Sequence, residues 1–141
     1  MMKQQSDVVV DWARFAHAKA SLGHNFWRVL NYFREDGGKA VTAIEDALRS
    51  GNAIGIIGPA DLLKSESIQM GALLVAELAE EIEMEARDCV EWHQSPAALL
   101  ETVIGLRVAF GQTVVQFDRE ASPLLARKPN VGPRTYVMNP V

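Results

Sequence analysis

Residues 60–72 read Ala-Asp-Leu-Leu-Lys-Ser-Glu-Ser-Ile-Gln-Met-Gly-Ala, and they are the most informative stretch of the chain. We expect them to form a helix that turns at Gly71, because glycine readily takes the left-handed conformation that ends a helix. Proline is tolerated in a first helical turn but kinks an interior, so Pro59 predicts a helix that either starts near Gly58 or bends there. Asp61 is then expected near the N-terminal end of this helix, where a carboxylate suits the helix dipole.

Two helices are expected before this stretch. Asp11 is a good N-cap for a short helix that is interrupted at Ser21-Leu22-Gly23. A long second helix begins near Asn25 and closes at Ser50-Gly51-Asn52. Its apolar residues recur at spacings of three and four, as in an amphipathic helix: Phe26, Val29, Leu30, Phe33, Val41, Ile44 and Leu48. The pair Gly37-Gly38 weakens its middle by about 1 kcal/mol per residue relative to alanine, which allows a local break there.

Two further helices are expected after residue 72. The first has an apolar stripe of Leu74, Leu78, Ile82, Ala86 and Cys89, and an acidic face of Glu77, Glu80, Glu81, Glu83 and Glu85. Ser95-Pro96 is a strong start signal for the last helix, because serine caps a helix and proline suits its first position. The apolar residues of this last helix are Leu99, Val103, Leu106, Phe110, Val114 and Phe117, and it ends before Ser122-Pro123.

The fold predicted from these elements is all-α. Four long amphipathic helices with short connections indicate an antiparallel four-helix bundle, here with a short additional N-terminal helix. We expect residues 1–10 to form an N-terminal lead, residues 11–121 the bundle, and residues 122–141 an extended, proline-containing C-terminal tail. Three tryptophans, Trp12, Trp27 and Trp92, are expected to pack in the core or between helices.

The overall composition excludes several functional classes. A chain of 141 residues with 48% apolar and 23% charged residues is typical of one soluble globular domain. Its net charge of -4 argues against a general nucleic-acid binder, which needs a basic face. The single cysteine, Cys89, excludes an internal disulfide and suits the cytoplasm. The sequence also suggests no signal peptide and no apolar run near the roughly 18 to 20 residues that span a bilayer.

Residues 60–72 resemble the signature of histidine-containing phosphotransfer (HPt) domains, which reads Ala-His-x-Leu-Lys-Gly/Ser and is followed by Leu-Gly-Ala. The residues in register are Leu63, Lys64, Ser65, Gly71 and Ala72, and Met70 replaces a leucine conservatively. Residues 22–26, Leu-Gly-His-Asn-Phe, are similar to the family's Leu-Gly-x-x-Phe, and residues 33–36, Phe-Arg-Glu-Asp, to its Phe-x-Glu-Asp. The resemblance covers roughly residues 11–121 and implies a helical bundle that works in a phosphorelay.

Asp61 stands at the position of the family's phosphorylated histidine. In the family, a neutral imidazole nitrogen attacks the aspartyl phosphate of a receiver domain and later passes the phosphoryl group to another receiver. The resemblance implies that Lys64 helps to neutralise phosphoryl charge and that Ser65 leaves room for the docking receiver, which brings its own magnesium. Asp61 cannot form phosphohistidine, so no relay is expected through it. Two explanations stay open: a protein that docks without transfer, or an exchange of histidine for aspartate.

Glu83 and Arg87 follow Asp61 by 22 and 26 residues, so an antiparallel helix pair would bring them to its level. The family often places a polar residue there to orient the histidine. Glu83 would accept the ring hydrogen of a histidine at position 61, whereas it would repel Asp61. The alternative interpretation is that Glu83 belongs to a solvated acidic face.

Other kinds of chemistry find little support in the sequence. His17, His24 and His93 lack the Leu-Lys-Ser pattern after them and are expected to be surface or cap residues. Di-metal carboxylate bundles need Glu-x-x-His pairs, which the chain lacks. It also has no zinc motif, no phosphate-binding loop and no dinucleotide-binding glycine pattern. We therefore expect no metal and no cofactor.

The resemblance implies response-regulator receiver domains and hybrid histidine kinases as partners, docked around Asp61, Lys64, Ser65 and Ile68. Neither nucleic acid nor a membrane is expected as a partner, and the protein is expected to be a cytoplasmic monomer. A rival hypothesis is a helical adaptor or dimerisation bundle without any phosphorelay link. The rival predicts a large hydrophobic surface for self-association, with Asp61 buried or irrelevant.

Overall fold

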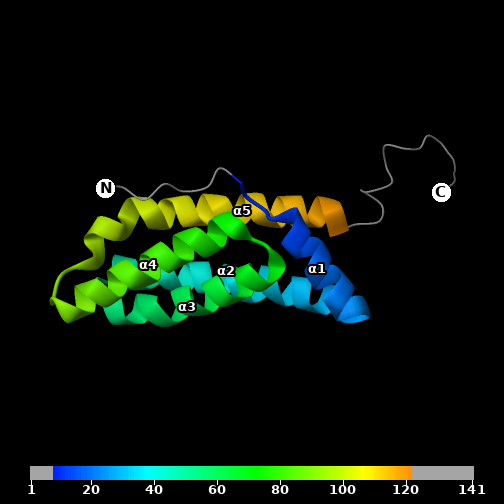
Figure 1. Ribbon diagram of the computed structural model, residues 1–141. Coiled ribbons are helices and arrows are strands. Elements are labelled where there is room, and N and C mark those ends of the chain that lie inside the picture. The colour runs from blue at the N-terminus through cyan, green and yellow to red at the C-terminus, as the bar shows by residue number, and fades with distance from the viewer. Residues whose placement is uncertain (1–7, 122–141) are drawn as a thin grey trace, which may run out of the picture.

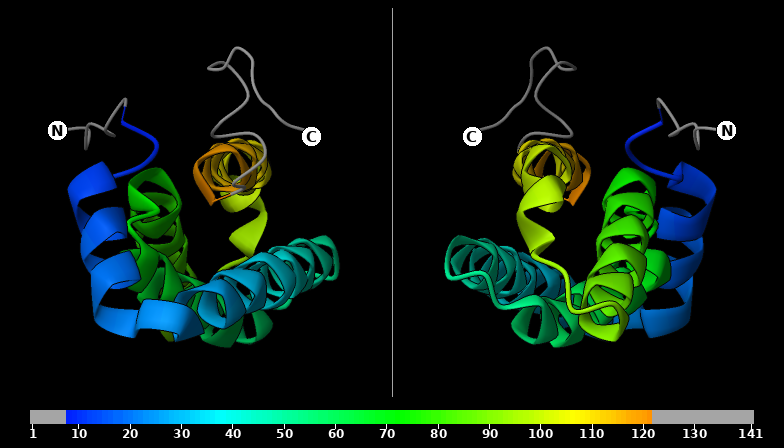
Figure 2. Two further views of the ribbon diagram at one scale, coloured as in Figure 1. Left: turned by 90° about the vertical axis from the view of Figure 1, so that its right-hand side faces the viewer. Right: turned by 90° about the vertical axis from the view of Figure 1, so that its left-hand side faces the viewer.

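A computed structural model describes residues 8–121, which are helical apart from short connections (Figure 1). The elements are α1 (Trp12–Leu22), the 3-10 helix η1 (Gly23–Asn25), α2 (Phe26–Arg49), α3 (Ala53–Met70), α4 (Leu73–Glu91), the 3-10 helix η2 (Pro96–Leu99) and α5 (Leu100–Ala121). Helices α2 to α5 run antiparallel in sequence order, and α1 lies at one end of them (Figures 1 and 2). The predicted four-helix bundle with a short N-terminal helix is confirmed. The tail at 122–141 and residues 1–7 of the lead lie outside the described residues.

The start of α1 is attached to the turn between α3 and α4 through Asp11 and Gly71. Oδ1 of Asp11 accepts the backbone N–H of Arg14 at 3.1 Å, so the predicted N-cap is confirmed. Gly71 ends α3 with a φ of 84°, in the left-handed region. A Cβ at Gly71 would lie 2.6 Å from the carbonyl oxygen of Asp11, so no side chain fits there. The backbone N–H of Asp11 donates to the carbonyl of Gly71 at 2.8 Å, which ties the start of α1 to this turn.

The N-terminal boundary of α3 differs from the prediction. Oδ1 of Asn52 caps the helix by accepting the N–H of Gly55 at 3.0 Å, and α3 therefore begins at Ala53. Pro59 lies inside α3, so a start near Gly58 is wrong. The expectation that Asp61 lies near the N-terminal end of the helix is also wrong, because two turns precede it. Asp61 projects from the middle of α3, outside the first turn where the helix dipole acts.

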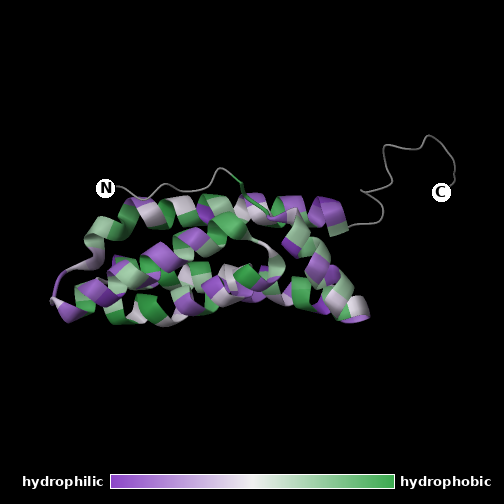
Figure 3. Cartoon of the chain, in the orientation of Figure 1, coloured by the Kyte–Doolittle hydropathy of each residue, from purple (hydrophilic) through white to green (hydrophobic). Residues whose placement is uncertain are grey.

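The core lies between the long helices, each of which alternates hydrophobic and hydrophilic residues along its length (Figure 3). Phenylalanines link α1, α2 and α5: the ring of Phe117 lies 4.8 Å from that of Phe15 and 5.6 Å from that of Phe33, between centroids. The predicted apolar faces of α2 and of the last helix are confirmed, although Leu99 lies in η2 before α5. The buried residues are Phe26, Leu30, Phe33, Val41, Ile44, Leu99, Val103, Leu106, Phe110 and Phe117. Val29, Leu48 and Val114 pack partly buried against them.

The glycine pair of α2 has a packing role. Helix α2 is continuous from Phe26 to Arg49, so the break that the pair would allow does not occur. Gly37 is buried against α5, and a Cβ added to it would lie 2.7 Å from Cε1 of Phe110. Gly38 is different, because its Cβ would lie 3.8 Å from Phe110, an ordinary contact distance. Gly37 thus permits the close approach of α2 and α5, whereas this approach does not depend on a glycine at position 38.

Alanine at these two neighbouring positions is expected to have opposite effects on stability. Gly38→Ala should raise the free energy of unfolding by up to about 1 kcal/mol, the difference in helix propensity. Gly37→Ala gains the same propensity but forces the Phe110 ring to move, at a cost of about 1–3 kcal/mol, so we expect a net loss of about 1 kcal/mol. Urea unfolding of the two variants measures both. Stabilisation by both would mean that the Phe110 ring moves aside freely.

Two expectations about apolar residues are corrected. Trp12, Trp27 and Trp92 are exposed at 41%, 45% and 66%, so the expectation that they lie in the core is wrong. Packing between helices is confirmed for Trp12 on α1, whose ring lies edge-on to that of Phe117 on α5 at 6.3 Å between centroids. The segment Pro96–Ala121 contains an 18-residue window of mean hydropathy 1.4 and is long and apolar enough to cross a membrane by length and composition. One such helix is weak evidence for a membrane span, because a core helix of a soluble protein meets the same criteria.

Candidate functional site

The middle of α3 presents a polar group to solvent. The side chain of Asp61 is 55% exposed, and Ser65, one turn later, is also exposed. Ile68, a further turn along the same helix face, is 50% exposed although it is a large apolar residue. The residues that sequence analysis assigned to docking thus share one accessible face of α3. Ser65 and Ile68 contribute surface there and lie outside the charged cluster around Asp61.

Lys64 connects Asp61 to the neighbouring helix. Its Nζ lies 3.7 Å from Oδ1 of Asp61 and 3.0 Å from Oε1 of Glu83 on α4. The second contact is an ion pair between two helices, because Lys64 lies on α3 and Glu83 on α4. Nη2 of Arg87 donates to the other carboxylate oxygen of Glu83 at 2.9 Å, and Nε donates to it at 3.2 Å. The structure therefore links four of the six predicted residues, Asp61, Lys64, Glu83 and Arg87, through consecutive ion pairs.

Glu83 is the buried anchor of this cluster. It is only 6% exposed, so its alternative interpretation as part of a solvated face is wrong. Burial acts to raise the pKa of Glu83, but its contacts with Lys64 and Arg87 outweigh burial and hold the pKa below its ordinary value. The pKa of Lys64 is raised, first by its polar contact with Glu83 and then, against partial burial, by the charges of Glu83 and Asp61. Lys64 is therefore a fixed cation beside position 61.

A second acidic pair on the α2 side of α3 was missed by sequence analysis. Glu66 and Asp36 line a groove of about 240 Å³ together with Val29, Tyr32, Phe33, Gln69 and Met70. Burial first, and then the charge of Asp36, raise the pKa of Glu66. A signal was present, since Asp36 ends the Phe-Arg-Glu-Asp stretch at 33–36 and Glu66 lies within residues 60–72. Sequence spacing alone does not show that the two carboxylates face each other across helices.

The histidines lie elsewhere on the molecule. His17 is on α1, where its Nε2 lies 3.4 Å from the hydroxyl of Ser21, and His24 is in η1. His93 follows α4 in a left-handed conformation with a φ of 53°. All three side chains are exposed, as the sequence predicted. Within residues 8–121, no group of three or more potential ligands gathers in a way that could hold a metal ion.

Asp61 and Lys64 can pair with charged groups of a ligand or partner, but the exposed position 61 carries no imidazole. A carboxylate in the place of Asp61 accepts hydrogen bonds and pairs with cations. Accepting a phosphoryl group would require this carboxylate to be surrounded by cations that offset the incoming charge, and the cluster supplies Lys64 at 3.7 Å. Asp61 and Lys64 therefore place one negative and one positive charge side by side at this point of α3.

The comparisons with known proteins bear on the fold. No family model matches the sequence, and no curated protein matches it. The crystal structure of histidine-containing phosphotransfer protein B (HptB) from Pseudomonas aeruginosa PAO1 superposes with a TM-score of 0.70. The match has 22% sequence identity and covers 82% of this chain and 96% of the HptB chain. This chain therefore has the helical-bundle fold of a histidine-containing phosphotransfer protein.

Proposed function

We propose that this protein is a phosphorelay component that docks response-regulator receiver domains, and that Asp61 prevents it from relaying phosphoryl groups. The observation that carries the proposal is the exposed position of Asp61 in the middle of α3, with Lys64 at 3.7 Å, on a fold shared with HptB. Hybrid histidine kinases that carry receiver domains belong to the same class of partner. The protein would act by binding receiver domains without removing their phosphoryl groups.

The chemistry at position 61 explains why docking and transfer separate. A relay needs a nucleophile that takes the phosphoryl group and then releases it easily, as an imidazole nitrogen does. The carboxylate of Asp61 would meet the acidic pocket of a receiver, where like charges repel. Lys64 offsets part of that repulsion, because it is held beside Asp61 by its ion pair with Glu83. The outcome is a bound complex without covalent transfer.

The surface around Asp61 is suited to a protein partner. Ile54 and Ile68 are exposed at 70% and 50% on the same side of α3, and apolar residues of this kind anchor interfaces. Between Ile54 and Asp61 lies Gly58, around which a Cβ would meet no atom within 4 Å. No side chain covers the helix backbone at Gly58, so a partner can approach the backbone closely there.

Binding to purified receiver domains tests this docking surface. The Ile68→Asp variant should bind a cognate receiver at least about tenfold more weakly, because it places a charge in an apolar contact. Ile104→Asp is the matched control, since Ile104 is an isoleucine of similar exposure, 56%, on α5. Equal loss of binding in both variants, or in neither, would contradict a docking surface on α3.

The rival function is a helical adaptor or dimerisation bundle with no phosphorelay role. It predicted that Asp61 is buried or irrelevant, and the exposure of Asp61 beside Lys64 favours the phosphorelay proposal. The two functions differ in an accessible measurement, because an unrelated adaptor would bind no member of a broad panel of receiver domains. A folded protein that fails against the whole panel would support the rival.

A further inference from the structure

The groove of about 240 Å³ between α2 and α3 adjoins the docking surface on α3. Its floor is apolar, because its lining includes Phe33 of α2 and Met70 of α3, which are buried. Its rim carries Tyr32 and Gln69, which are exposed. Gln69 lies one helical turn after Ser65 on the same face of α3. The groove therefore opens at the edge of the surface that we propose meets a receiver domain.

Two carboxylates line this groove, one from each helix. Asp36 of α2 is exposed, Glu66 of α3 is half-buried, and the pKa of Glu66 is raised by burial and by the charge of Asp36. Oε1 of Glu66 is buried and finds no hydrogen-bond donor in the part of the chain that the structure describes. A buried carboxylate oxygen without a donor has lost its hydration without compensation. The groove therefore lacks a donor that a bound cationic group could supply.

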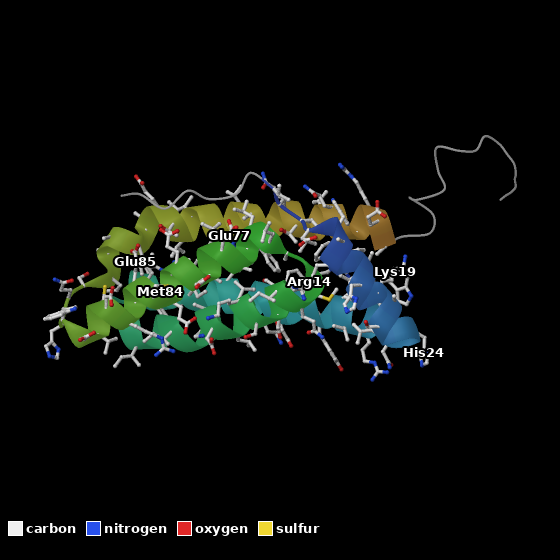
Figure 4. All side chains as sticks on the ribbon, viewed as in Figure 1. Arg14, Lys19, His24, Glu77, Met84 and Glu85 are labelled. Atoms are coloured by element: carbon white, nitrogen blue, oxygen red, sulfur yellow. The ribbon has the colours of Figure 1, made fainter. Side chains whose placement is uncertain are left out.

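The described residues of the chain itself do not supply this cation. Among residues 8–121, no lysine or arginine forms an ion pair with either carboxylate of the groove. Arg34 of α2 pairs instead with Asp118 of α5. In Figure 4, Lys19 projects from α1, and its Nζ lies 5.8 Å from the centroid of the Trp27 ring. The groove thus holds two carboxylates whose charges these cations leave unpaired.

We propose that this groove receives an arginine side chain of the docked receiver domain. The inference rests on the proposed docking function and adds a second contact to it. A guanidinium group is planar, carries five N–H donors and can pair with two carboxylates at once. The apolar floor suits the methylene groups of an arginine, and the ring of Tyr32 can stack on its guanidinium. The carboxylates and the cation are thus complementary in charge.

Other cationic ligands fit the groove less well. A divalent metal ion needs more ligands than two carboxylates, and no group of three or more potential ligands gathers within residues 8–121. Pockets for small molecules usually measure about 300–1,000 Å³, so a groove of about 240 Å³ is better matched to one side chain. A lysine ammonium is a compact, strongly hydrated charge that lacks the flat fork of arginine. Arginine is therefore the side chain that the groove favours.

An arginine in this groove would also offset the repulsion expected at Asp61. The carboxylate of Asp61 meets the acidic pocket of a receiver in the proposed complex, and Lys64 offsets only part of that repulsion. Glu66 follows Asp61 by five residues, about 7.5 Å further along the helix axis. An attractive contact at this short distance stabilises a complex in which position 61 carries no histidine.

Removal of either charge tests the groove through both binding and stability. Glu66→Gln and Asp36→Asn should each bind a receiver at least about tenfold more weakly than the wild-type protein, because each removes a charge-assisted contact with the guanidinium. Burial and the charge of Asp36 raise the pKa of Glu66, so neither variant should lower the free energy of unfolding in urea at pH 7. A merely structural role would lower stability and binding together. Glu35→Gln is the matched control, since it removes a neighbouring charge of α2 that does not line the groove.

A double-mutant cycle identifies the residue that enters the groove. The exposed arginines of the receiver are replaced by glutamine one at a time, and one replacement should weaken binding to the wild-type protein but not to Glu66→Gln. Coupling to a lysine alone overturns the assignment to arginine. If Ile68→Asp loses binding while Glu66→Gln and Asp36→Asn bind like the wild-type protein, the groove inference fails and the docking surface stands. A wild-type protein that binds no receiver of a broad panel overturns both.

Discussion

The Asp61→His variant is expected to accept phosphoryl groups from a phosphorylated receiver domain, whereas the wild-type protein is expected to accept none. In the variant, a ring nitrogen attacks the phosphorus of the receiver's aspartyl phosphate; the N–P bond forms and the receiver regains its carboxylate. The groups that would support this transfer are already present around position 61. Lys64 is held by Glu83 beside position 61, where it can pair with the phosphoryl oxygens. The side chain at this position is exposed and reachable by a partner.

The experiment compares the wild-type protein and the variant side by side with a radiolabelled, phosphorylated receiver. Label that appears on the variant alone, and that is lost in acid, identifies phosphohistidine. The Asp61→Asn variant is the control for removal of the negative charge, because it should bind receivers without being labelled. Label on neither protein, with receivers that phosphorylate a known acceptor, would contradict the phosphorelay proposal and favour a scaffold.

Sequence analysis predicted the parts of the site that depend on helical spacing. Asp61, Lys64 and Ser65 lie within two turns of one helix, so any helix through them places them close together. The distance of 22 residues to Glu83 also gave the correct level on α4, because two antiparallel helices and a short turn leave little freedom. The burial of Glu83 could not be predicted, since the acidic residues of α4 look alike in the sequence.

The predictions that were wrong concern features of the molecule that depend on tertiary contacts. Pro59 was expected either to start the helix near Gly58 or to bend it, and the start was wrong, because the cap at Asn52 begins α3 at Ala53 and the helix continues past Pro59. The pair Gly37-Gly38 suggested a weak point, although Gly37 is needed to admit the ring of Phe110. Trp92 was expected to be packed, and it lies exposed beyond the end of α4. Local propensity gives no information on which neighbour fills the space beside a residue.

Removing the charge of Glu83 is expected to lower the free energy of unfolding by about 1–2 kcal/mol at pH 7. The Glu83→Gln variant leaves Lys64 and Arg87 without their shared buried partner, although both can still turn toward water, which limits the cost. The pKa of Glu83 is lower in the folded protein than its ordinary value of 4.5. Its contribution is therefore complete above about pH 4.5 and is lost as the pH falls through the lower pKa of the folded state. Urea unfolding at several pH values should show the two proteins converging in acid.

Glu85→Gln provides a control of opposite sign on the same helix. The pKa of Glu85 is raised, first by burial and then by the charges of Glu81 and Asp88, so its ionised form is disfavoured in the folded protein. Removing this charge should cost no stability at pH 7 and should slightly increase it, and the effect should fade as the pH falls and Glu85 takes up a proton. If both variants lost stability equally at pH 7, the cause would lie in helix propensity and not in the ion pairs of Glu83. Opposite signs would place the electrostatic support of α4 specifically in the contacts beneath position 61.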